Sequence, residues 1–356
     1  MLLFDLIQVA IGQRTNLSYS PSKEEWFSLY NEATKQSVVG IAFEGVQKLP
    51  KEQWPPQALL FEWIGVSEQI KSQNKLLNKR TSEISKLFED AGFRSCILKG
   101  QGNAVMYPNP DSRTSGDVDI WVDGDRKTIH DFVVYRVKNA EDGDMHITMP
   151  VFNDVMVEVH YKPRYMNTPK YDKCLMRFFD EYREEQFEHK VALPGDMGQI
   201  AVPTAEFNIV YQMSHLMGHF FVEGIGLRQF IDYYYVLKVY RSEIHRSNLD
   251  LVLQQTGMMK FAKGVMWVQK VCLGLEDDYL IAEPDEKIGK LILHEMLEGG
   301  NFGHYDERYK GRKKGMLIRG IIDTYRLMKL ATTFPSESIW KIIKKVDNQK
   351  WKLKDV

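Results

Sequence analysis

Apolar residues recur at helical spacing along the first 92 residues of the chain. An apolar residue at every third or fourth position is typical of a helix that packs one face on a core. Ser22 precedes the second stripe as a side-chain cap, and Gly92 closes the last and longest one. We therefore predict a helical region over residues 1–92, packed on the sheet that follows, with helices over 2–12, 23–36, 38–49 and 57–91.

The segment that follows contains shorter apolar runs with the two-residue alternation of strands. We expect strands over 93–98 and 116–122, and helices over 125–135 and 174–188. Two further runs, 146–152 and 155–160, are separated by the turn dipeptide Asn153-Asp154, which predicts an antiparallel pair. We assign residues 93–200 to one α+β domain.

From Pro203 onward the pattern returns to helical spacing. An apolar run over 207–221 predicts a buried helix, and further stripes predict helices that begin at Arg228 and cover 248–256, 259–274, 285–298 and 336–351. We assign residues 201–356 to a C-terminal helical domain. Arg228 and Asp232 are four residues apart, which predicts a salt bridge within one helix.

The charge and composition narrow the function classes. The 356 residues carry a formal net charge of −1, so we expect no DNA partner, because no global positive field is present. The three cysteines are far apart and lack metal or redox spacing, which favours the reducing cytoplasm. No apolar run is long enough to predict a membrane span. Asp5 interrupts the apolar start, which we interpret as a packed helix and not a signal peptide.

The candidate chemistry lies in the stretch from Cys96 to Val122, which reads CILKGQGNAVMYPNPDSRTSGDVDIWV. Asp117 and Asp119 share one face of the predicted strand because side chains alternate. At a separation of about 4 Å and an effective dielectric constant of about 20, the two carboxylates repel by about 4 kcal/mol. A solvated strand end with two aspartates is one interpretation; an oxygen-liganded Mg²⁺ bound with substrate phosphates is the other.

These motifs resemble a known superfamily. The strand into Lys99-Gly100, the loop with Arg113 and the Gly116-Asp117-Val118-Asp119 strand resemble the polymerase-β-like nucleotidyltransferases, and more narrowly the bacterial uncharacterised nucleotidyltransferases. Toxin-type nucleotidyltransferases are similar at a greater distance. The resemblance covers residues ~90–165 and, less closely, ~200–305. It implies a mixed sheet flanked by helices, two Mg²⁺ ions and a nucleoside triphosphate co-substrate, with ATP expected.

The resemblance also implies a third carboxylate on a strand adjacent to Asp117 and Asp119. Glu158 fits that role, and His160 lies on the same face of the strand. His160 has three interpretations: it orients Glu158, it contacts the substrate, or it is a solvated histidine at the end of the strand. We expect Asp117, Asp119 and Glu158 to be both catalytic residues and metal ligands, with Glu158 as general base.

Residues expected near the nucleotide surround this set. Lys99 either offsets phosphate charge or pairs with Asp117. Arg113 either binds phosphate or forms a local ion pair with Asp111 or Asp117. Other candidates for nucleotide contact are Gly100, Gln101, Gly116, His160, His215 and His219.

Some of these candidates have competing interpretations. Gln101 stands where the superfamily has serine or glycine, so backbone amides of 101–103 at the start of a helix over 100–107 would replace the serine contact. His215 and His219 lie four residues apart, a spacing that fits either a pair of metal ligands or ordinary packing of a helix. The glycine-rich turn over 299–303 lacks a phosphate-loop order and is expected to dock beside the cleft.

Two basic segments lie near the C-terminus. The run Arg308–Lys314 is strongly basic, and the predicted last helix has an apolar stripe opposite a lysine face. A basic amphipathic tail can bind anionic membrane or RNA, and the alternative is a packed helix with solvated lysines. The lysines concerned are Lys341, Lys344, Lys345 and Lys350.

The sequence therefore predicts an Mg²⁺-dependent enzyme that moves a nucleoside monophosphate from a nucleoside triphosphate to an acceptor hydroxyl, with release of pyrophosphate. The acceptor is a small molecule, a tRNA or a protein. Alternatives are a toxin-like enzyme that acts on tRNA or protein, and a degenerate module that binds nucleotides without catalysis.

Overall fold

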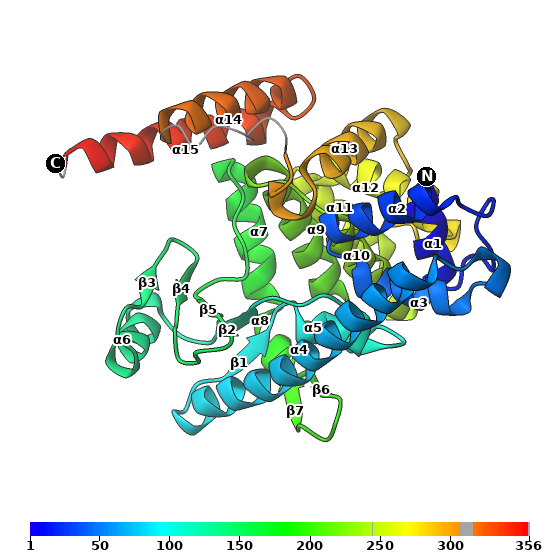
Figure 1. Ribbon diagram of the computed structural model, residues 1–356. Coiled ribbons are helices and arrows are strands. Elements are labelled where there is room, and N and C mark those ends of the chain that lie inside the picture. Colours follow the sequence, from blue (N-terminus) through cyan, green and yellow to red (C-terminus); the bar gives the residue numbers. More distant parts are fainter. Residues whose placement is uncertain (244, 307–315, 355–356) are drawn as a thin grey trace.

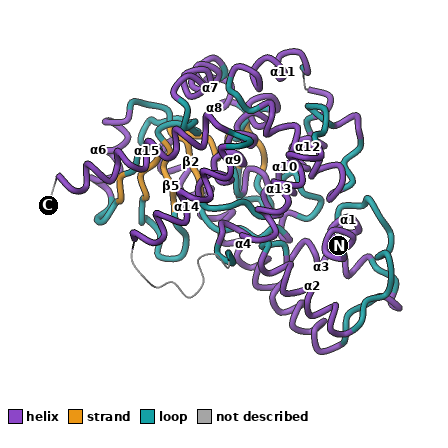
Figure 2. Tube along the Cα trace, turned by 90° about the horizontal axis from the view of Figure 1, so that it is seen from above, coloured by secondary structure: helices purple, strands orange, loops and turns teal. Residues whose placement is uncertain are grey.

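A computed structural model describes residues 1–243, 245–306 and 316–354 of the chain. A five-stranded sheet lies between the long helix α4 on one side and a group of helices from the second half of the chain on the other (Figure 1). Seen from above, the N-terminal helices lie at one end of the molecule and α6 lies at the other (Figure 2).

The four predicted N-terminal helices are all present, and each bound lies within two residues of the prediction. Glu25 N donates to Ser22 Oγ over 3.2 Å, and Ser22 N donates to the Glu25 carboxylate over 2.8 Å, so the predicted cap forms a complete capping box. The helices are α1 (Leu2–Ala10), α2 (Lys23–Lys35), α3 (Val39–Lys48) and α4 (Gln57–Asp90), with the 3₁₀ turn η1 (Lys51–Gln53).

The N-terminal region packs on more than the sheet. The C-terminal half of α4 covers one sheet face, but α1–α3 share an apolar core with helices beyond residue 205. Gln8 Nε2 donates to the Cys272 carbonyl over 3.0 Å, and Gln36 Nε2 donates to the Met296 carbonyl over 3.0 Å. These bonds join segments that lie more than 250 residues apart in the chain.

The sheet is mixed, in the order β1-β2-β5-β4-β3. The pair β2 and β5 is parallel and the other neighbours are antiparallel. The strands are β1 (Ser95–Ile97), β2 (Val118–Val122), β3 (Glu141–Asp142), β4 (His146–Thr148) and β5 (Val157–His160). The short helices α5 (Gln101–Ala104) and α6 (Arg126–Arg136) and the turn η2 (Pro110–Ser112) connect them.

The prediction that β4 and β5 form an antiparallel pair is confirmed, but the prediction of a tight turn at Asn153-Asp154 is wrong. β4 ends at Thr148, and residues 149–156 form a wider connection. Pro150 explains the difference, since it has no N–H to continue the ladder of hydrogen bonds.

Both faces of the sheet are buried. Val118, Ile120 and Val122 lie in the core that α4 and α6 cover, as predicted. On the opposite face, the Trp121 ring lies 4.8 Å from Phe187 and 5.8 Å from Phe207, between ring centroids. The face that carries Asp117 and Asp119 is therefore not a solvated edge, because helices from the second half of the chain cover it.

The second half of the chain is helical, as predicted, with two additions. The hairpin of β6 (Lys190–Ala192) and β7 (Gln199–Ala201) and the helix α14 (Met316–Ala331) were not predicted. The single helix expected over 174–188 is interrupted before the separate helix α8 (Arg183–Glu188). The remaining helices are α7 (Pro169–Glu181), α9 (Ala205–Val222), α10 (Leu227–Val239), α11 (Arg246–Gln255), α12 (Met259–Leu273), α13 (Glu286–Gly299) and α15 (Pro335–Lys354), with 3₁₀ turns η3 (Arg241–Glu243), η4 (Asp277–Tyr279) and η5 (Asn301–Gly303).

The C-terminal segment forms a helical hairpin of α14 and α15 beside the rest of the molecule (Figure 1). The basic run Arg308–Lys314 lies outside the described residues. All three cysteines are free. None of the described helices combines the length and the apolarity that a membrane crossing needs.

Candidate active site

Three carboxylates converge where the parallel strands β2 and β5 lie side by side. Asp119 is directly opposite Glu158 in the strand register, and Asp117 lies two residues before Asp119 on the same face. One carboxylate oxygen from each of the three lies within 4.8 Å of the others. The structure therefore brings together the three carboxylates that the sequence singled out.

Lys99 pairs with these carboxylates from the end of β1. Its Nζ lies 2.6 Å from Asp119 Oδ2 and 3.6 Å from Asp117 Oδ2. Burial opposes the charge of Lys99, but Asp119 and Asp117 outweigh it and raise the pKa of Lys99. Of the two interpretations of Lys99, an ion pair is therefore present, with Asp119 as the nearer partner.

Asp119 is held in its charged form although it is only 1 % exposed. Burial favours the neutral acid, but the ammonium of Lys99 and the imidazole of His160 outweigh it, so the pKa of Asp119 lies well below its usual range. His160 Nε2 lies 3.0 Å from Asp119 Oδ1. Asp119 Oδ2 is buried, and no hydrogen bond of good geometry reaches it from the described residues.

His160 is buried at 2 % exposure, so the solvated strand-end interpretation is wrong. Burial lowers its pKa, but hydrogen bonds to Asp119 and Glu158 outweigh that effect, and the pKa of His160 is raised. Sequence reasoning missed His146, whose Nδ1 lies 3.6 Å from Glu158 Oε2. The predicted pairing of the two strands could have indicated His146, because it lies opposite His160 in the register of β4 and β5.

The donor set fits a hard divalent cation. Carboxylate oxygens are the ligands that Mg²⁺ prefers, and Asp117, Asp119 and Glu158 offer them within one small volume. Asp119 Oδ2 has an ion pair with Lys99 but accepts no hydrogen bond of good geometry from the described residues, so a cation would add a partner there. In the described part of the chain, His146, Glu158 and His160 form a second, overlapping group with donor atoms equally close.

These carboxylates line a cavity of about 580 Å³ between the sheet and α9. His215 and His219 line it from α9, with ring centroids 4.3 Å apart. Burial lowers the pKa of both imidazoles, and His219 Nδ1 lies 3.3 Å from Glu223 Oε2. Neither histidine belongs to the groups of described residues whose donor atoms lie close enough to share a metal.

Arg113 has a partner that the sequence did not indicate. Its Nε and Nη2 donate to the two carboxylate oxygens of Asp232 on α10, each over 2.7 Å, and Tyr107 Oη donates to the same carboxylate over 2.6 Å. The expected local ion pair with Asp111 or Asp117 is therefore wrong. The contact of Arg113 with a nucleotide stays a prediction.

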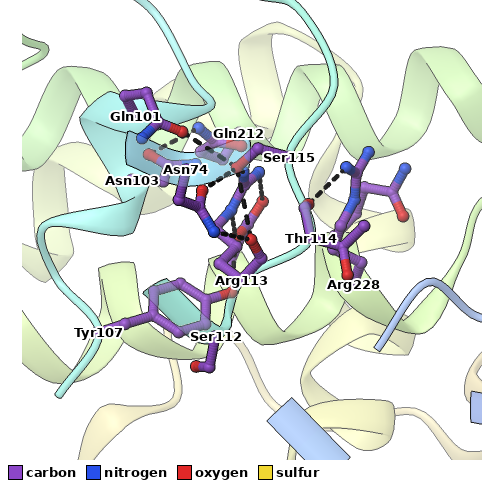
Figure 3. A network of polar contacts seen from close by, with 12 residues as sticks. Asn74, Gln101, Asn103, Tyr107, Ser112, Arg113, Thr114, Ser115, Gln212 and Arg228 are labelled. Atoms are coloured by element: carbon purple, nitrogen blue, oxygen red, sulfur yellow. Dashed lines mark hydrogen bonds and ion pairs between the residues drawn. The ribbon is translucent and has the colours of Figure 1, made fainter. Parts of the chain in front are cut away.

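The predicted salt bridge between Arg228 and Asp232 is wrong for the same reason, because Arg113 already occupies both oxygens of Asp232. Arg228 Nη1 donates instead to the Thr114 carbonyl over 2.8 Å (Figure 3). Its Nε is buried without a hydrogen-bond partner in the described chain. Arg228 thus stabilises the loop before β2, and its Nε is left without a hydrogen-bond partner among the described residues.

Gln101 is also held in this polar network (Figure 3). It is buried, its Nε2 donates to Asn78 Oδ1, and its Oε1 lies 3.0 Å from Ser115 Oγ. The helix expected over 100–107 has only the four residues of α5, and it begins after Gly100, which adopts a φ of 62° and a ψ of −113°. The side chain of Gln101 therefore positions the loop before Asp117.

A second cavity of about 20 Å³, the size of one water molecule, lies behind Asp117. Gly100, Gly116, Arg113 and Arg228 line it, together with Phe302 from η5. Phe302 also lines the larger cavity, so the predicted placement of the 299–303 turn beside the cleft is confirmed.

The sequence matches a known protein family. The model of a family described as uncharacterised nucleotidyltransferase matches residues 22–274. Among solved structures, an antigenic nucleotidyltransferase-like protein from Paracoccidioides brasiliensis is similar at 10% identity and a TM-score of 0.34, over 60% of this chain and 95% of that one. No curated protein matches the sequence. The family match covers most of the chain, including all three carboxylates, and the chain therefore belongs to the family of uncharacterised nucleotidyltransferases.

Proposed function

We propose that this protein is an Mg²⁺-dependent nucleotidyltransferase of the polymerase-β-like superfamily. It would transfer a nucleoside monophosphate from a nucleoside triphosphate, with ATP as the expected donor, to an acceptor hydroxyl. The observation that carries the proposal is the convergence of Asp117, Asp119 and Glu158 within 4.8 Å at the wall of a cavity of about 580 Å³.

Asp117, Asp119 and Glu158 would hold the Mg²⁺. When bound, Mg²⁺ neutralises phosphate charge and lowers the pKa of a coordinated hydroxyl. Asp119 is suited to anchoring, because it is buried and its charge is fixed by Lys99 and His160. Lys99 Nζ lies between Asp117 and Asp119, and from there it is placed to offset the negative charge that develops on the phosphate.

Glu158 is suited to accepting a proton. Its side chain is 22% exposed, and the imidazoles of His146 and His160 each lie within 4 Å of its carboxylate. The acceptor oxygen forms a bond to the α-phosphorus, the bond from that phosphorus to the bridging oxygen breaks, and pyrophosphate leaves. The hydroxyl proton moves to the Glu158 carboxylate, which is the general base.

The phosphate contact first assigned to Arg113 fits Arg228 better. Arg113 gives both sides of its guanidinium to Asp232. Arg228 lines the small cavity beside Gly100 and Asp117 and has no carboxylate partner within the described ranges. Because that cavity has the size of one water molecule, Arg228 is placed to donate to a single phosphate oxygen there.

The test measures nucleotide binding and turnover in Asp119→Asn and Glu158→Gln. Isothermal titration calorimetry with Mg²⁺ and α,β-methylene-ATP reports binding, and pyrophosphate release in the presence of candidate acceptors reports turnover. We expect both variants to lose turnover by at least ~10²-fold, because each removes a metal ligand. Asp131→Asn is the matched control, since it removes a carboxylate from an exposed ion pair with Lys127.

Two results would overturn the proposal. One is Mg²⁺-dependent turnover in a folded Asp119→Asn variant that equals the turnover of the wild type. The other is a wild-type protein that binds no nucleotide with Mg²⁺, which would favour the degenerate module. Circular dichroism confirms that each variant is folded, and Glu158→Gln keeps the test decisive if Asp119→Asn unfolds, because Glu158 is more exposed.

A further inference from the structure

The wall of the large cavity also carries a cation that the proposed chemistry does not use, Arg164, and further cations lie near it. The segment after β5 contributes Lys162, Arg164 and Tyr165, and Arg164 and Tyr165 line the same cavity as the three carboxylates. Of these residues, the candidate site described above includes none.

Arg164 is held in place but not neutralised. Its guanidinium lies against Gly218 in the middle of α9, where an added Cβ would overlap it, so α9 has a notch that the arginine fills. The Arg164 Nη1 lies 4.0 Å from Met145 Sδ, and its Nε is buried without a hydrogen-bond partner within the described ranges. No carboxylate of a described residue lies within ion-pair distance of Arg164. A half-buried guanidinium whose Nε has no partner is suited to an anionic ligand.

Two lysines of α15 join this arginine. Lys344 Nζ lies 4.9 Å from the centre of the Tyr165 ring, and the guanidinium carbon of Arg164 lies 6.0 Å from the same ring. Burial, and then the charges of Arg164 and Lys344, lower the pKa of Lys341. Glu223 lines the same cavity and keeps its negative charge, because burial lowers the pKa of the His219 imidazole beside it. Three cations therefore lie near one carboxylate here, and of the three only Arg164 lines the cavity itself.

The position of this group separates it from the nucleotide side of the site. Gly100 and Arg228 line the small cavity and do not line the large one, whereas Arg164 lines the large cavity and does not line the small one. Asp117 and Lys99 line both, so they lie between the two groups. Transfer needs two ligands on opposite sides of the reacting phosphate, and each side here has its own unpaired arginine.

We propose that Arg164, Lys341 and Lys344 bind a phosphate group of the acceptor, so that the acceptor of this enzyme is a phosphorylated molecule. This inference rests on the proposed nucleotidyl transfer. Three carboxylates at the cavity wall repel an anionic acceptor, and Arg164 in the wall of the same cavity, with the two lysines near it, offsets that repulsion. A phosphate dianion matches a cluster of three cations better than a neutral acceptor does.

The experiment uses inorganic phosphate as the probe, observed by ³¹P NMR in the full-length protein saturated with Mg²⁺ and α,β-methylene-ATP. We expect wild-type protein to bind phosphate while the nucleotide analogue stays bound. Arg164→Gln should weaken phosphate binding by at least ~10-fold, and the double variant Lys341→Gln/Lys344→Gln by at least ~5-fold. Lys345→Gln is the matched control, since it removes the same charge from the same helix but from a lysine whose Nζ lies 2.6 Å from Asp323. Its phosphate affinity should stay within ~2-fold of the wild type.

Gly218→Ala is a second variant that keeps every charge. Its methyl group would occupy the notch on α9 and displace the Arg164 guanidinium. We expect it to weaken phosphate binding as Arg164→Gln does, while alanine is favourable in a helix. Phosphate binding equal to the wild type in both Arg164→Gln and Gly218→Ala would overturn the proposal.

Competition separates the two possible sources of the phosphate. If phosphate displaces the nucleotide analogue and Arg164→Gln weakens the analogue's binding ~10-fold, the cations hold the triphosphate and the proposal is wrong. If the wild type binds no nucleotide at all, the proposed function fails. Arg164-dependent phosphate binding would then remain as a separate result, so the two failures can be distinguished.

Discussion

Two buried carboxylates with cationic partners behave differently in this fold. Asp232 has two hydrogen bonds from Arg113 and one from Tyr107, so its oxygens are well satisfied. Asp119 has a close ammonium at Lys99, but its Oδ2 accepts no hydrogen bond of good geometry from the described residues. The first arrangement is complete without a ligand, whereas the second has room for another cation.

The arginines show the same difference. Arg113 lies in a polar network that fixes the loop before β2, and its charge is fully paired. Arg164 faces the large cavity and has no carboxylate partner within the described ranges. A residue that combines burial with complete pairing stabilises the fold, and a residue that combines burial with unused donors is available to a ligand. The following predictions test that distinction.

The largest loss of stability is expected for Arg113→Met. The variant leaves the Asp232 carboxylate buried without its cation, and breaking a buried pair from one side costs about 3–5 kcal/mol. Urea unfolding followed by circular dichroism measures the free energy of unfolding. Adding Asp232→Asn to the variant should restore part of the loss. A change below ~1 kcal/mol in Arg113→Met would contradict the structural role of the pair.

Lys99→Met should cost less, and the cost should depend on metal. Its loss removes a charged contact to Asp119, worth about 2 kcal/mol in metal-free protein. Because Lys99 and a divalent cation compete for the same carboxylates, Mg²⁺ should stabilise this variant more than it stabilises the wild type. Thermal unfolding with and without Mg²⁺ measures the difference. Arg113→Met is the control, and Mg²⁺ should not restore its stability; equal Mg²⁺ effects in Lys99→Met and the wild type would exclude the competition.

Asn74→Ala tests the polar network behind the site, and its expected effect on stability is smaller. Asn74 Nδ2 donates to the carbonyls of Asp111 over 2.9 Å and Arg113 over 2.8 Å, so the variant leaves buried acceptors unsatisfied. We expect a loss of about 1–2 kcal/mol in urea unfolding. Nucleotide affinity should fall as well, since this network positions the loop before Asp117. A stable variant with normal affinity would show that the loop is fixed by other contacts.

The sequence predicted the elements that depend on local pattern. The helices before residue 92 and the buried helix α9 follow from apolar spacing. Glu158, on the strand beside β2, was assigned from the resemblance to a superfamily, and alternation placed His160 on the same face. The hairpin of β6 and β7 was missed because its strands have three residues each, too few for a clear alternation.

Contacts between distant segments could not be predicted. Arg113 and Asp232 lie 119 residues apart, and the local rule of four-residue spacing indicated Arg228 as the partner instead. Arg164 lies in an irregular segment after β5 that has no periodic pattern, so its contact with Gly218 is seen only in the folded chain. Side-chain partners across the fold depend on packing, which one sequence does not specify.

The smallest predicted effect is the pH dependence that Asp232 adds to stability. Burial raises its pKa, but Arg113 outweighs burial, and the pKa of Asp232 in the folded protein is lowered from 3.8. A carboxyl with a lowered folded pKa stabilises the protein fully above its unfolded pKa and loses that contribution as the pH falls through the folded value. The free energy of unfolding of the wild type should therefore decrease below about pH 4, and that of Asp232→Asn should decrease less steeply. Urea unfolding between pH 3 and pH 6 measures how steeply the free energy of unfolding changes with pH in both proteins.

Asp131→Asn is the control, because it removes a carboxylate from an exposed ion pair, and its pH slope should stay close to that of the wild type. If the slope of Asp232→Asn equals the slope of this control, the buried pair is not coupled to pH.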